Sequence, residues 1–450
     1  MDESTCGDED RISNLPNCIL NNILSLLPTK DAVSTSALSS KWKCQWTSLT
    51  SFDFDDSILY PSNANYSVEV IRFMNFVERV LLLRDNFNIK KFRLSCRVPD
   101  NAARVNAWIS AATRHKTEEL DICLFVDSSL VLPRSVFNSE VLQTLKIEMS
   151  CSLILPDSIS FPCLKTLQIS LAIFVDEEST QNLFSSCPVL ENLVILECEW
   201  MYLKKTTFSI PTLKSLVIED LPYFGGSTGG CVITVDAPNL LFLEYSGLLL
   251  NEVRTCDVPS SLEKTFIHIP RLCNEQEEFD RRAVGFLRNL KSAKSMKMSN
   301  ATVKSLFFAG SNLNRLPMFQ NLTYLVLSMA IDFSFQAMMD FLDCAPNLES
   351  LVFSEGFSLF QPFSDNSHII KVPKCFVSSL KEVHINNFYW LDEVIWFLSY
   401  LLKNAAVLEH MYILCSKYPP VEDLEKQNDI KNHLQLLAKA RARSCTITIV

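Results

Sequence analysis

One apolar spacing, apolar-x-x-apolar-x-apolar, returns along most of this 450-residue chain and constrains its fold more than any other feature. The last two apolar positions of each copy lie two residues apart, so they point to the same side of a short strand. A single unit would leave that side uncovered, and stacking on neighbouring units would bury it. The copies are Ile89-Phe92-Leu94, a weaker one at Leu120 and Ile122, Leu142-Leu145-Ile147, Leu164-Leu167-Ile169, Leu190-Leu193-Ile195, Leu213-Leu216-Ile218, Leu240-Leu243-Tyr245, Leu262-Thr265-Ile267, Ala293-Met296-Met298, Leu322-Leu325-Leu327, Leu348-Leu351-Phe353, Leu380-Val383-Ile385 and Leu408-Met411-Ile413.

The distance between copies points to a known class of repeat. From residue 89 to residue 408 there are twelve steps of about 27 residues each, within the roughly 20–29-residue period of leucine-rich repeats. Between copies, pieces such as 179–186 and 334–344 have helical spacing and end before a proline, which favours an extended chain. The steps are uneven, so we expect an irregular α/β solenoid over residues 51–370, with a curved parallel sheet and helices on its convex side. A generic α/β domain with coincidental spacing is the alternative.

Before the repeats, residues 11–50 predict a compact pair of helices. Leu15-Pro16 would open the first helix, since proline is tolerated in a first turn. Its apolar residues then form one broad stripe, and Pro28 ends it. Thr29 would cap a second helix that runs through Val33 and Leu38 into Trp42 and Trp46.

This segment, LPNCILNNILSLLPTKDAVSTSALSSKWKCQW, resembles an F-box, the motif by which a substrate receptor docks on the Skp-type adaptor of an SCF (Skp-cullin-F-box) ubiquitin ligase. It departs from the usual pattern at Asn17, Cys18 and Ser40. The resemblance implies an all-α F-box over residues 11–50 with a Skp-like adaptor as partner and, through it, a cullin. The residues expected to form the docking surface and the small core behind it are Leu15, Pro16, Ile19, Leu20, Ile23, Leu24, Leu27, Pro28, Val33, Leu38 and Trp42.

The C-terminal part resembles the FBD module that follows leucine-rich repeats in a family of plant F-box proteins. The segments VPKCFVSSLKEVHINNF, LDEVIWFLSYLLKNAAVLEHMYIL and TITIV carry this resemblance. We expect helices over 392–402 and 428–442 and strands over 408–414 and 445–450. An α+β FBD unit over residues 371–450 would then cap the last repeat, whose core would otherwise be exposed.

Charge and cysteine content exclude several classes of protein. With 41 Lys+Arg against 51 Asp+Glu, the net charge is −10, which argues against nucleic acid or an acidic membrane as a partner. No apolar run approaches the roughly 18 residues of a membrane span. The sixteen cysteines form no CxxC pair, so we expect reduced cysteines and no metal. The acidic residues 1–10 predict a disordered tail instead of a secretory signal, and so a cytoplasmic and/or nuclear protein.

Nothing in the sequence requires catalysis or a cofactor. Gly225 to Gly230 contains a formal G-x-S-x-G, but a nucleophile elbow needs a helix after the serine, and here the strand-like CVITV follows. We therefore expect a loop between repeats. Glu177-Glu178 and Asp55-Asp56 are adjacent carboxylates, which we expect to be solvated on surface loops.

Taken together, these patterns predict a non-catalytic subunit that brings a target protein to a ubiquitin ligase. A scaffold that does not lead to ubiquitination and a receptor that responds to a small molecule are the alternatives. In a leucine-rich solenoid the outward positions between core residues line the concave face, where an apolar strip would mark an interaction surface. The candidate target-binding residues are Lys146, Glu148, Gln168, Val194, Leu196, Val217, Glu219, Val326 and Val352.

Overall fold

The computed structural model describes residues 12, 15–59, 66–98, 102–126, 130–200, 202–220, 230–256, 259, 261–270, 276–306, 316–328, 335–355, 371–388, 390–416, 424–439 and 445–450. The expected tail at 1–10 and residues 221–229 of the glycine-rich loop lie outside these ranges. The chain divides into two compact units, Met1–Leu203 and Lys204–Val450, which we call the N-terminal and C-terminal units and describe separately.

The N-terminal unit opens with the expected helices, but the second of them is interrupted. Its helices are α1 (Asn17–Ser25), α2 (Thr29–Ser34) and the 3₁₀ turns η1 (Thr35–Ala37) and η2 (Trp42–Ser48). The predicted continuous helix into Trp42 and Trp46 is therefore wrong. Thr29 is also not a cap, because Pro28 holds the cap position and Thr29 is the first helical residue. The Thr29 hydroxyl instead accepts a hydrogen bond from the backbone of Asp53.

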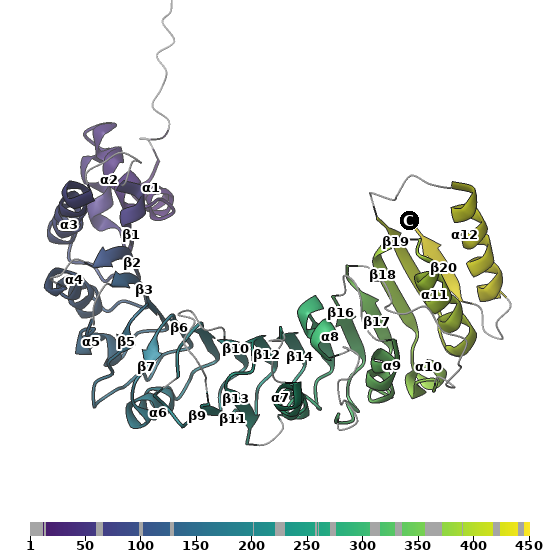
Figure 1. The fold of residues 1–450 in the computed structure, drawn as a ribbon. Helices are drawn as coiled ribbons and strands as arrows, with labels where there is room; N and C mark the ends of the chain where they lie inside the picture. The colour runs from purple at the N-terminus through teal and green to yellow at the C-terminus, as the bar shows by residue number, and fades with distance from the viewer. Residues whose placement is uncertain are drawn as a thin grey trace, which may run out of the picture. The chain divides into compact units, whose positions relative to one another are not determined.

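A parallel sheet follows in the N-terminal unit, with helices along one side (Figure 1). Its strands, in spatial order, are β1 (Ser51–Asp55), β2 (Lys91–Val98), β3 (Glu119–Val126), β4 (Thr144–Met149), β6 (Thr166–Ser170) and β8 (Asn192–Leu196). The helices are η3 (Asp56–Leu59), α3 (Tyr66–Leu83), α4 (Ala103–Arg114), α5 (Arg134–Phe137) and α6 (Glu177–Ser185). A short pair, β5 (Ser152–Leu153) and β7 (Ile173–Phe174), completes the described part of this unit.

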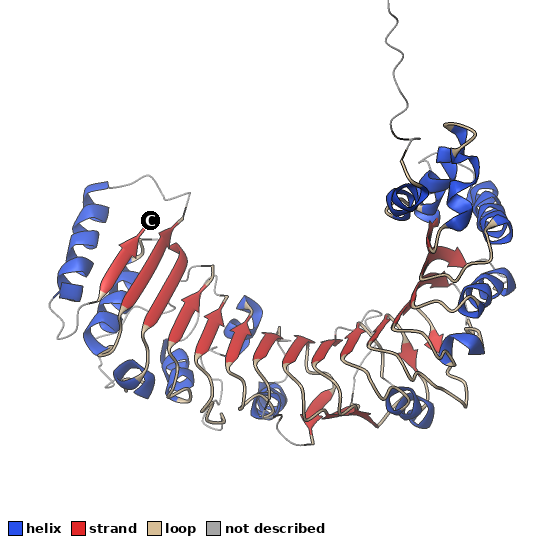
Figure 2. Ribbon diagram, turned by 180° about the vertical axis from the view of Figure 1, so that it is seen from behind, coloured by secondary structure: helices blue, strands red, loops and turns tan. Residues whose placement is uncertain are grey.

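The C-terminal unit repeats this arrangement with longer strands near its end. Its parallel sheet runs β10 (Ser215–Asp220), β12 (Phe242–Gly247), β14 (Lys264–His268), β15 (Ser295–Met298), β16 (Tyr324–Leu327), β17 (Ser350–Phe353), β18 (Glu382–Phe388), β19 (His410–Cys415) and β20 (Thr446–Ile449). A second sheet contains, in spatial order, β13 (Glu252–Thr255), β11 (Val232–Asp236) and β9 (Lys205–Ser209). The helices are α7 (Gln276–Arg288), α8 (Asn300–Leu306), α9 (Phe335–Asp343), α10 (Lys374–Ser378), α11 (Asp392–Asn404) and α12 (Leu424–Lys439). Figure 2 shows the helices of this unit beside its strands.

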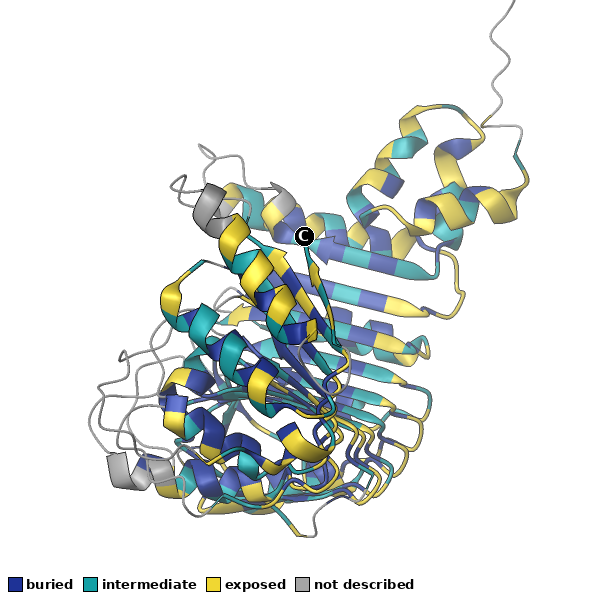
Figure 3. Cartoon of the chain, turned by 90° about the vertical axis from the view of Figure 1, so that its right-hand side faces the viewer, coloured by how far each residue is buried: buried dark blue, intermediate teal, exposed yellow. Residues whose placement is uncertain are grey.

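The repeat positions form the core of both units, as the spacing predicted. Strands such as β4 and β10 alternate half-buried and buried residues along their length, and Figure 3 shows the same alternation on the ribbon. Leu325, Leu327 and Leu351 are fully buried. Helices cover this inward side: the ring of Phe353 on β17 lies 5.8 Å from that of Phe397 on α11. Full burial of one such side chain contributes roughly 1.5–3 kcal/mol, so stacked repeats stabilise one another.

Two local predictions need correction. Glu177 and Glu178 do not lie on a loop, because they form the first turn of α6 behind the N-cap Asp176, where negative charge suits the helix dipole. Asp56 is not solvated, because it is 5% exposed and accepts a hydrogen bond from the backbone N–H of Arg97. At the C-terminus the expected helices and strands are present with small shifts, as α11, β19, α12 and β20.

Candidate functional site

The first candidate site is an exposed apolar patch on α1 and the residues after it. Ile19, Ile23 and Leu27 recur at helical spacing on one side of α1, and all three are exposed. Leu26, which the sequence analysis did not select, is 85% exposed and extends the same side. Leu38 after η1 is 68% exposed. A cluster of apolar side chains left in water on a helical face indicates a protein-interaction surface. We call Ile19, Ile23, Leu26 and Leu27 the α1 patch, and Leu38 is a further exposed apolar residue of the same segment.

The opposite side of α1 belongs to the core, which separates the predicted docking residues into two groups. Leu20 and Leu24 are fully buried, and Trp42 is 5% exposed. Pro16 is exposed. Leu15, Pro28 and Val33 are half-buried and belong to neither group. The sequence pattern identified both groups together because a wide apolar stripe does not reveal which part of it faces the core.

Polar contacts hold α1 against η2 and fix the patch. The Asn21 side-chain amide donates to the Ser48 hydroxyl over 3.1 Å, and the Gln45 amide donates to the Asn17 side-chain oxygen over 3.4 Å. The Lys41 ammonium donates to the backbone carbonyl of Leu15. Asn17, Cys18 and Ser40, the departures from the F-box pattern, are all exposed, and of these Asn17 accepts the hydrogen bond from Gln45.

The second candidate site is the outward face of the sheet in the N-terminal unit, which is charged. Arg93 lies 2.9 Å from Asp53, 3.4 Å from Asp55 and 3.8 Å from Asp121, nitrogen to oxygen. Burial raises the pKa of Asp121, while nearby lysine and arginine side chains lower it. The predicted target residues on β4, β6 and β8 occupy outward positions and are half-buried. They are Lys146, Glu148, Gln168, Val194 and Leu196.

A cysteine lies within this charged face. The Cys123 thiol on β3 donates to a Glu148 carboxylate oxygen over 3.3 Å. Burial and the neighbouring Glu148 carboxylate raise the pKa of Cys123 to about 11. The thiol therefore stays protonated at neutral pH, which makes it a poor nucleophile and a poor metal ligand.

On the C-terminal unit the outward face carries aromatic as well as charged side chains. Of the predicted residues, Val217, Glu219 and Val326 are half-buried, but Val352 is only 9% exposed and offers little surface to a partner. The prediction of Val352 as an accessible contact is therefore wrong. The apolar pattern in the sequence did not indicate the larger side chains at equivalent outward positions. These are Phe266, Lys297, Tyr324, His384, His410 and Tyr412. Taking every outward position of the repeat, and not only apolar examples, would have found them.

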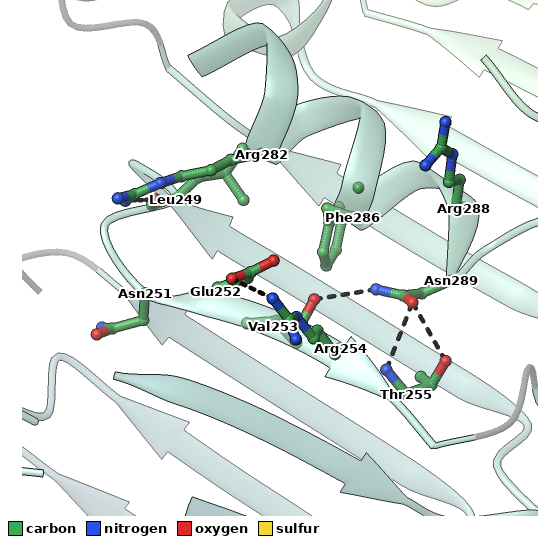
Figure 4. Close-up of a pocket in the computed structure, with 11 residues that line it drawn as sticks. Leu249, Asn251, Glu252, Val253, Arg254, Thr255, Arg282, Phe286, Arg288 and Asn289 are labelled. Carbon is green, nitrogen blue, oxygen red and sulfur yellow. Dashed lines mark hydrogen bonds and ion pairs between the residues drawn. The ribbon is translucent and has the colours of Figure 1, made fainter. Parts of the chain in front are cut away.

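A small pocket of about 250 Å³ lies between α7 and β13 (Figure 4). Three arginines line it, yet two of them are engaged: Arg282 donates to the carbonyls of Leu249 and Leu250, and Arg254 pairs with Glu252 at 2.7 Å. Ligand pockets usually measure about 300–1,000 Å³ and are mostly apolar. This polar recess adds no support for the small-molecule receptor.

Beside the pocket, a buried network fixes the turn between β12 and β13. The Tyr245 hydroxyl donates to Asp220 over 3.0 Å, and the Asn251 amide donates to the other carboxylate oxygen over 2.6 Å. Burial raises the pKa of Asp220, against the hydrogen bonds from Asn251 and Tyr245, which lower it. Burial raises the pKa of Tyr245 well above its ordinary value, and the Asp220 carboxylate adds to this. Because each polar group has a partner, the network stabilises the turn instead of forming a reactive site.

The part of the chain that the structure describes contains neither a metal-binding cluster nor a membrane-spanning helix. No group of three or more His, Cys, Asp and Glu residues there could hold a metal ion. Among the same residues, no helix combines the length and apolar character needed to cross a bilayer.

Known protein families match the N-terminal helical segment and the repeats of this chain. A family model for F-box domains matches residues 12–54, and one described as At1g61320/AtMIF1, LRR domain, matches residues 80–440. F-box/LRR-repeat protein At3g59200 of Arabidopsis thaliana is 31% identical over 478 aligned residues, covering 98% of this chain and 88% of the relative. Putative F-box/FBD/LRR-repeat protein At3g59240 of the same plant is 31% identical over 362 residues, covering 78% of this chain and 70% of the relative. The repeat match continues past residue 370, so the FBD boundary there stays a prediction.

Proposed function

Because this chain belongs to the F-box/LRR-repeat family of plants, we propose that it is the substrate-recognition subunit of an SCF-type ubiquitin ligase. F-box domains generally bind Skp-like adaptors, and leucine-rich repeats bind targets. F-box/LRR proteins are generally non-catalytic adaptors, and we assign this chain the same role. The observation that carries the proposal is the α1 patch, whose exposed apolar side chains lie on the F-box itself.

In this proposal the Skp-like adaptor covers the α1 patch and a cullin joins through the adaptor. Ile19, Ile23 and Leu26 would lose their contact with water, and burying each such side chain contributes roughly 1.5–3 kcal/mol. The buried residues Leu20, Leu24 and Trp42 would not contact the adaptor, and they support the patch from behind. Few charged groups are needed, since apolar burial alone would supply most of the affinity.

The outward faces of the two units would hold the target protein. The ligase would gain rate through proximity, since tethering raises the local concentration of target lysines near the ubiquitin-loaded enzyme. This chain would then need no nucleophile, metal or cofactor of its own.

Co-purification with a plant Skp-like adaptor and a cullin tests the proposal, with a variant lacking residues 11–50 as control. We expect both partners to accompany the intact chain and neither to accompany the control. Failure of the intact chain to retain the adaptor would contradict the receptor role. If the adaptor binds but no bound partner is ubiquitinated by the reconstituted complex, the scaffold alternative replaces it.

A further inference from the structure

Four neighbouring strands of the C-terminal unit present a regular grid of outward side chains. In one row Tyr324 on β16 lies opposite Ser350 on β17, which lies opposite Glu382 on β18 and then His410 on β19. The next row holds Val326, Val352, His384 and Tyr412 in the same register. Parallel strands lie about 4.8 Å apart, so Tyr324 and Glu382 flank Ser350 with roughly 10 Å between their Cα atoms. We call these eight residues the β16–β19 face.

Aromatic rings dominate one half of this face. The rings of His384 and Tyr412 lie 4.6 Å apart at 19°, and those of His410 and Tyr412 lie 5.9 Å apart at 25°. Tyr412 is 38% exposed and Tyr324, on the other side of β17, is 42% exposed. Partly exposed tyrosine rings therefore lie on both sides of Ser350 and Val352, and His384 stacks against the Tyr412 ring.

A hydroxyl without a partner lies between them. Ser350 is 9% exposed, and its oxygen has no hydrogen-bond partner among the residues that the structure describes. Buried polar groups are nearly always hydrogen-bonded, so each exception requires an explanation. The Ser350 oxygen is itself shielded from solvent, so a bound partner would not reach it without movement of neighbouring side chains.

The charge of the face is incompletely compensated. The only ion-pair contact found for Glu382 in the described structure is His384 at 3.5 Å, and that residue is charged only when protonated. The Glu382 side chain remains 45% exposed. Nearby, Lys381 pairs with Glu349 at 3.1 Å, and Lys297 lies over the ring of Phe266 on β14, on the side away from β17. Glu382 is thus an accessible carboxylate among aromatic rings.

We propose that the β16–β19 face binds an arginine side chain of the target protein. This inference rests on the proposed target-binding role of the repeats but not on adaptor docking. The guanidinium group is planar, stacks on aromatic rings and donates several hydrogen bonds. Stacked on an exposed aromatic ring of this face, it would donate to the Glu382 carboxylate. A lysine would offer a point charge to Glu382 but could not stack in this way.

Peptide selection on the full-length chain tests this inference. A library of random peptides displayed on phage is enriched on the wild-type chain, and the most enriched peptide is synthesised with arginine, with lysine and with citrulline at the selected position. Citrulline keeps the planar shape and removes the charge. Affinities are measured on the wild type, on Glu382→Gln and Ser350→Ala, and on the control Glu244→Gln, which changes an outward carboxylate of β12 in the same sheet.

We expect enriched peptides to share one arginine whose replacement by citrulline weakens binding to the wild type about tenfold or more. Glu382→Gln should lose a similar factor and no longer distinguish arginine from citrulline. Ser350→Ala, which changes an oxygen shielded from solvent, and Glu244→Gln should show no loss. Equal melting temperatures would show that the variants are folded.

Three results would overturn the inference. The first is a selection that enriches no peptide, or only peptides without a shared arginine. The second is an affinity of Glu382→Gln for the arginine peptide equal to that of the wild type. The third is equal affinity of the wild type for the lysine and the arginine peptides. Adaptor co-purification by the same variants separates this inference from the proposed function. If Glu382→Gln loses the peptide but still binds the adaptor, the β16–β19 face is the target face. If the wild-type chain binds the peptide but never binds the adaptor, only the ligase role is refuted.

Discussion

The hydroxyl of Thr29 accepts a hydrogen bond of 2.7 Å from the backbone N–H of Asp53, and this bond joins the first residue of α2 to the middle of β1. β1 is the last strand on this side of the sheet, so that N–H has no further strand to pair with. Thr29 is 1% exposed. The F-box therefore supplies a side-chain acceptor to the edge of the repeat sheet, and edges without such cover invite unwanted pairing.

This bond predicts a stability difference between two substitutions. Thr29→Val keeps the volume but leaves the N–H of Asp53 without an acceptor, so the free energy of unfolding should fall by about 1–3 kcal/mol. Thr29→Ser retains the hydroxyl and should lose clearly less. Urea unfolding followed by circular dichroism measures both. An unchanged free energy of unfolding in Thr29→Val would show that the hydrogen bond does not contribute.

The two sides of α1 should respond differently to substitution. Ile23→Asp places a charge on the exposed side, so it should abolish adaptor co-purification while leaving the unfolding transition unchanged. Leu24→Ala removes a fully buried side chain and should cost about 2–5 kcal/mol of stability. Adaptor retention by Ile23→Asp, measured in pull-downs, would exclude this side of the helix as the dock.

Two glycines of the C-terminal unit should respond in opposite ways to substitution by alanine. A Cβ at Gly247 would lie 2.6 Å from the carbonyl oxygen of Asp220 and 2.8 Å from its Cβ, so Gly247→Ala should destabilise by about 1–3 kcal/mol. Gly285 in α7 has nothing within 4 Å of such an atom. Gly285→Ala should therefore stabilise by roughly 0.5–1 kcal/mol through helix propensity. Thermal unfolding of both variants gives the comparison, and a loss at Gly285 as large as at Gly247 would contradict it.

The raised pKa of Cys123 predicts that its thiol is alkylated slowly and at a rate that depends strongly on pH. Because its pKa is about 11, against about 8.5 for an ordinary cysteine, its alkylation rate should still rise with pH above 9. Glu148→Gln removes the carboxylate that opposes thiolate formation and should accelerate the reaction. Iodoacetamide labelling of the native chain, followed by peptide mass spectrometry, measures the rate at this one cysteine. A rate that levels off near pH 9 in the wild type would contradict the assignment.

Much of the fold follows from the sequence because the repeat spacing is a local property. Two apolar residues with one residue between them share a side of a strand whatever the rest of the chain does. The same spacing therefore located Leu325 and Leu327 in β16 and Met411 and Ile413 in β19, all essentially buried. The helices α6 and α9 were likewise indicated by their own periodicity and by the prolines that follow them.

Local caps and breaks were less predictable, since tertiary contacts decide between conformations of similar energy. Thr29 has the residue type of an N-cap, but the edge of β1 competes for its hydroxyl. The segment from Thr35 to Ser48 divides into two 3₁₀ turns. Trp42 and Trp46 are both buried there, and no pattern within the segment specified that break.

The sequence by itself determined the class of this protein: an F-box followed by leucine-rich repeats, with a core set by spacing. Only the tertiary structure decided which side of α1 remains exposed and what lies on the outward faces. Tyr324, Ser350, Glu382 and His410 are 86 residues apart from first to last, yet parallel pairing places them in one row. A binding surface of this kind depends on the register between strands, and register is fixed only when the repeats stack.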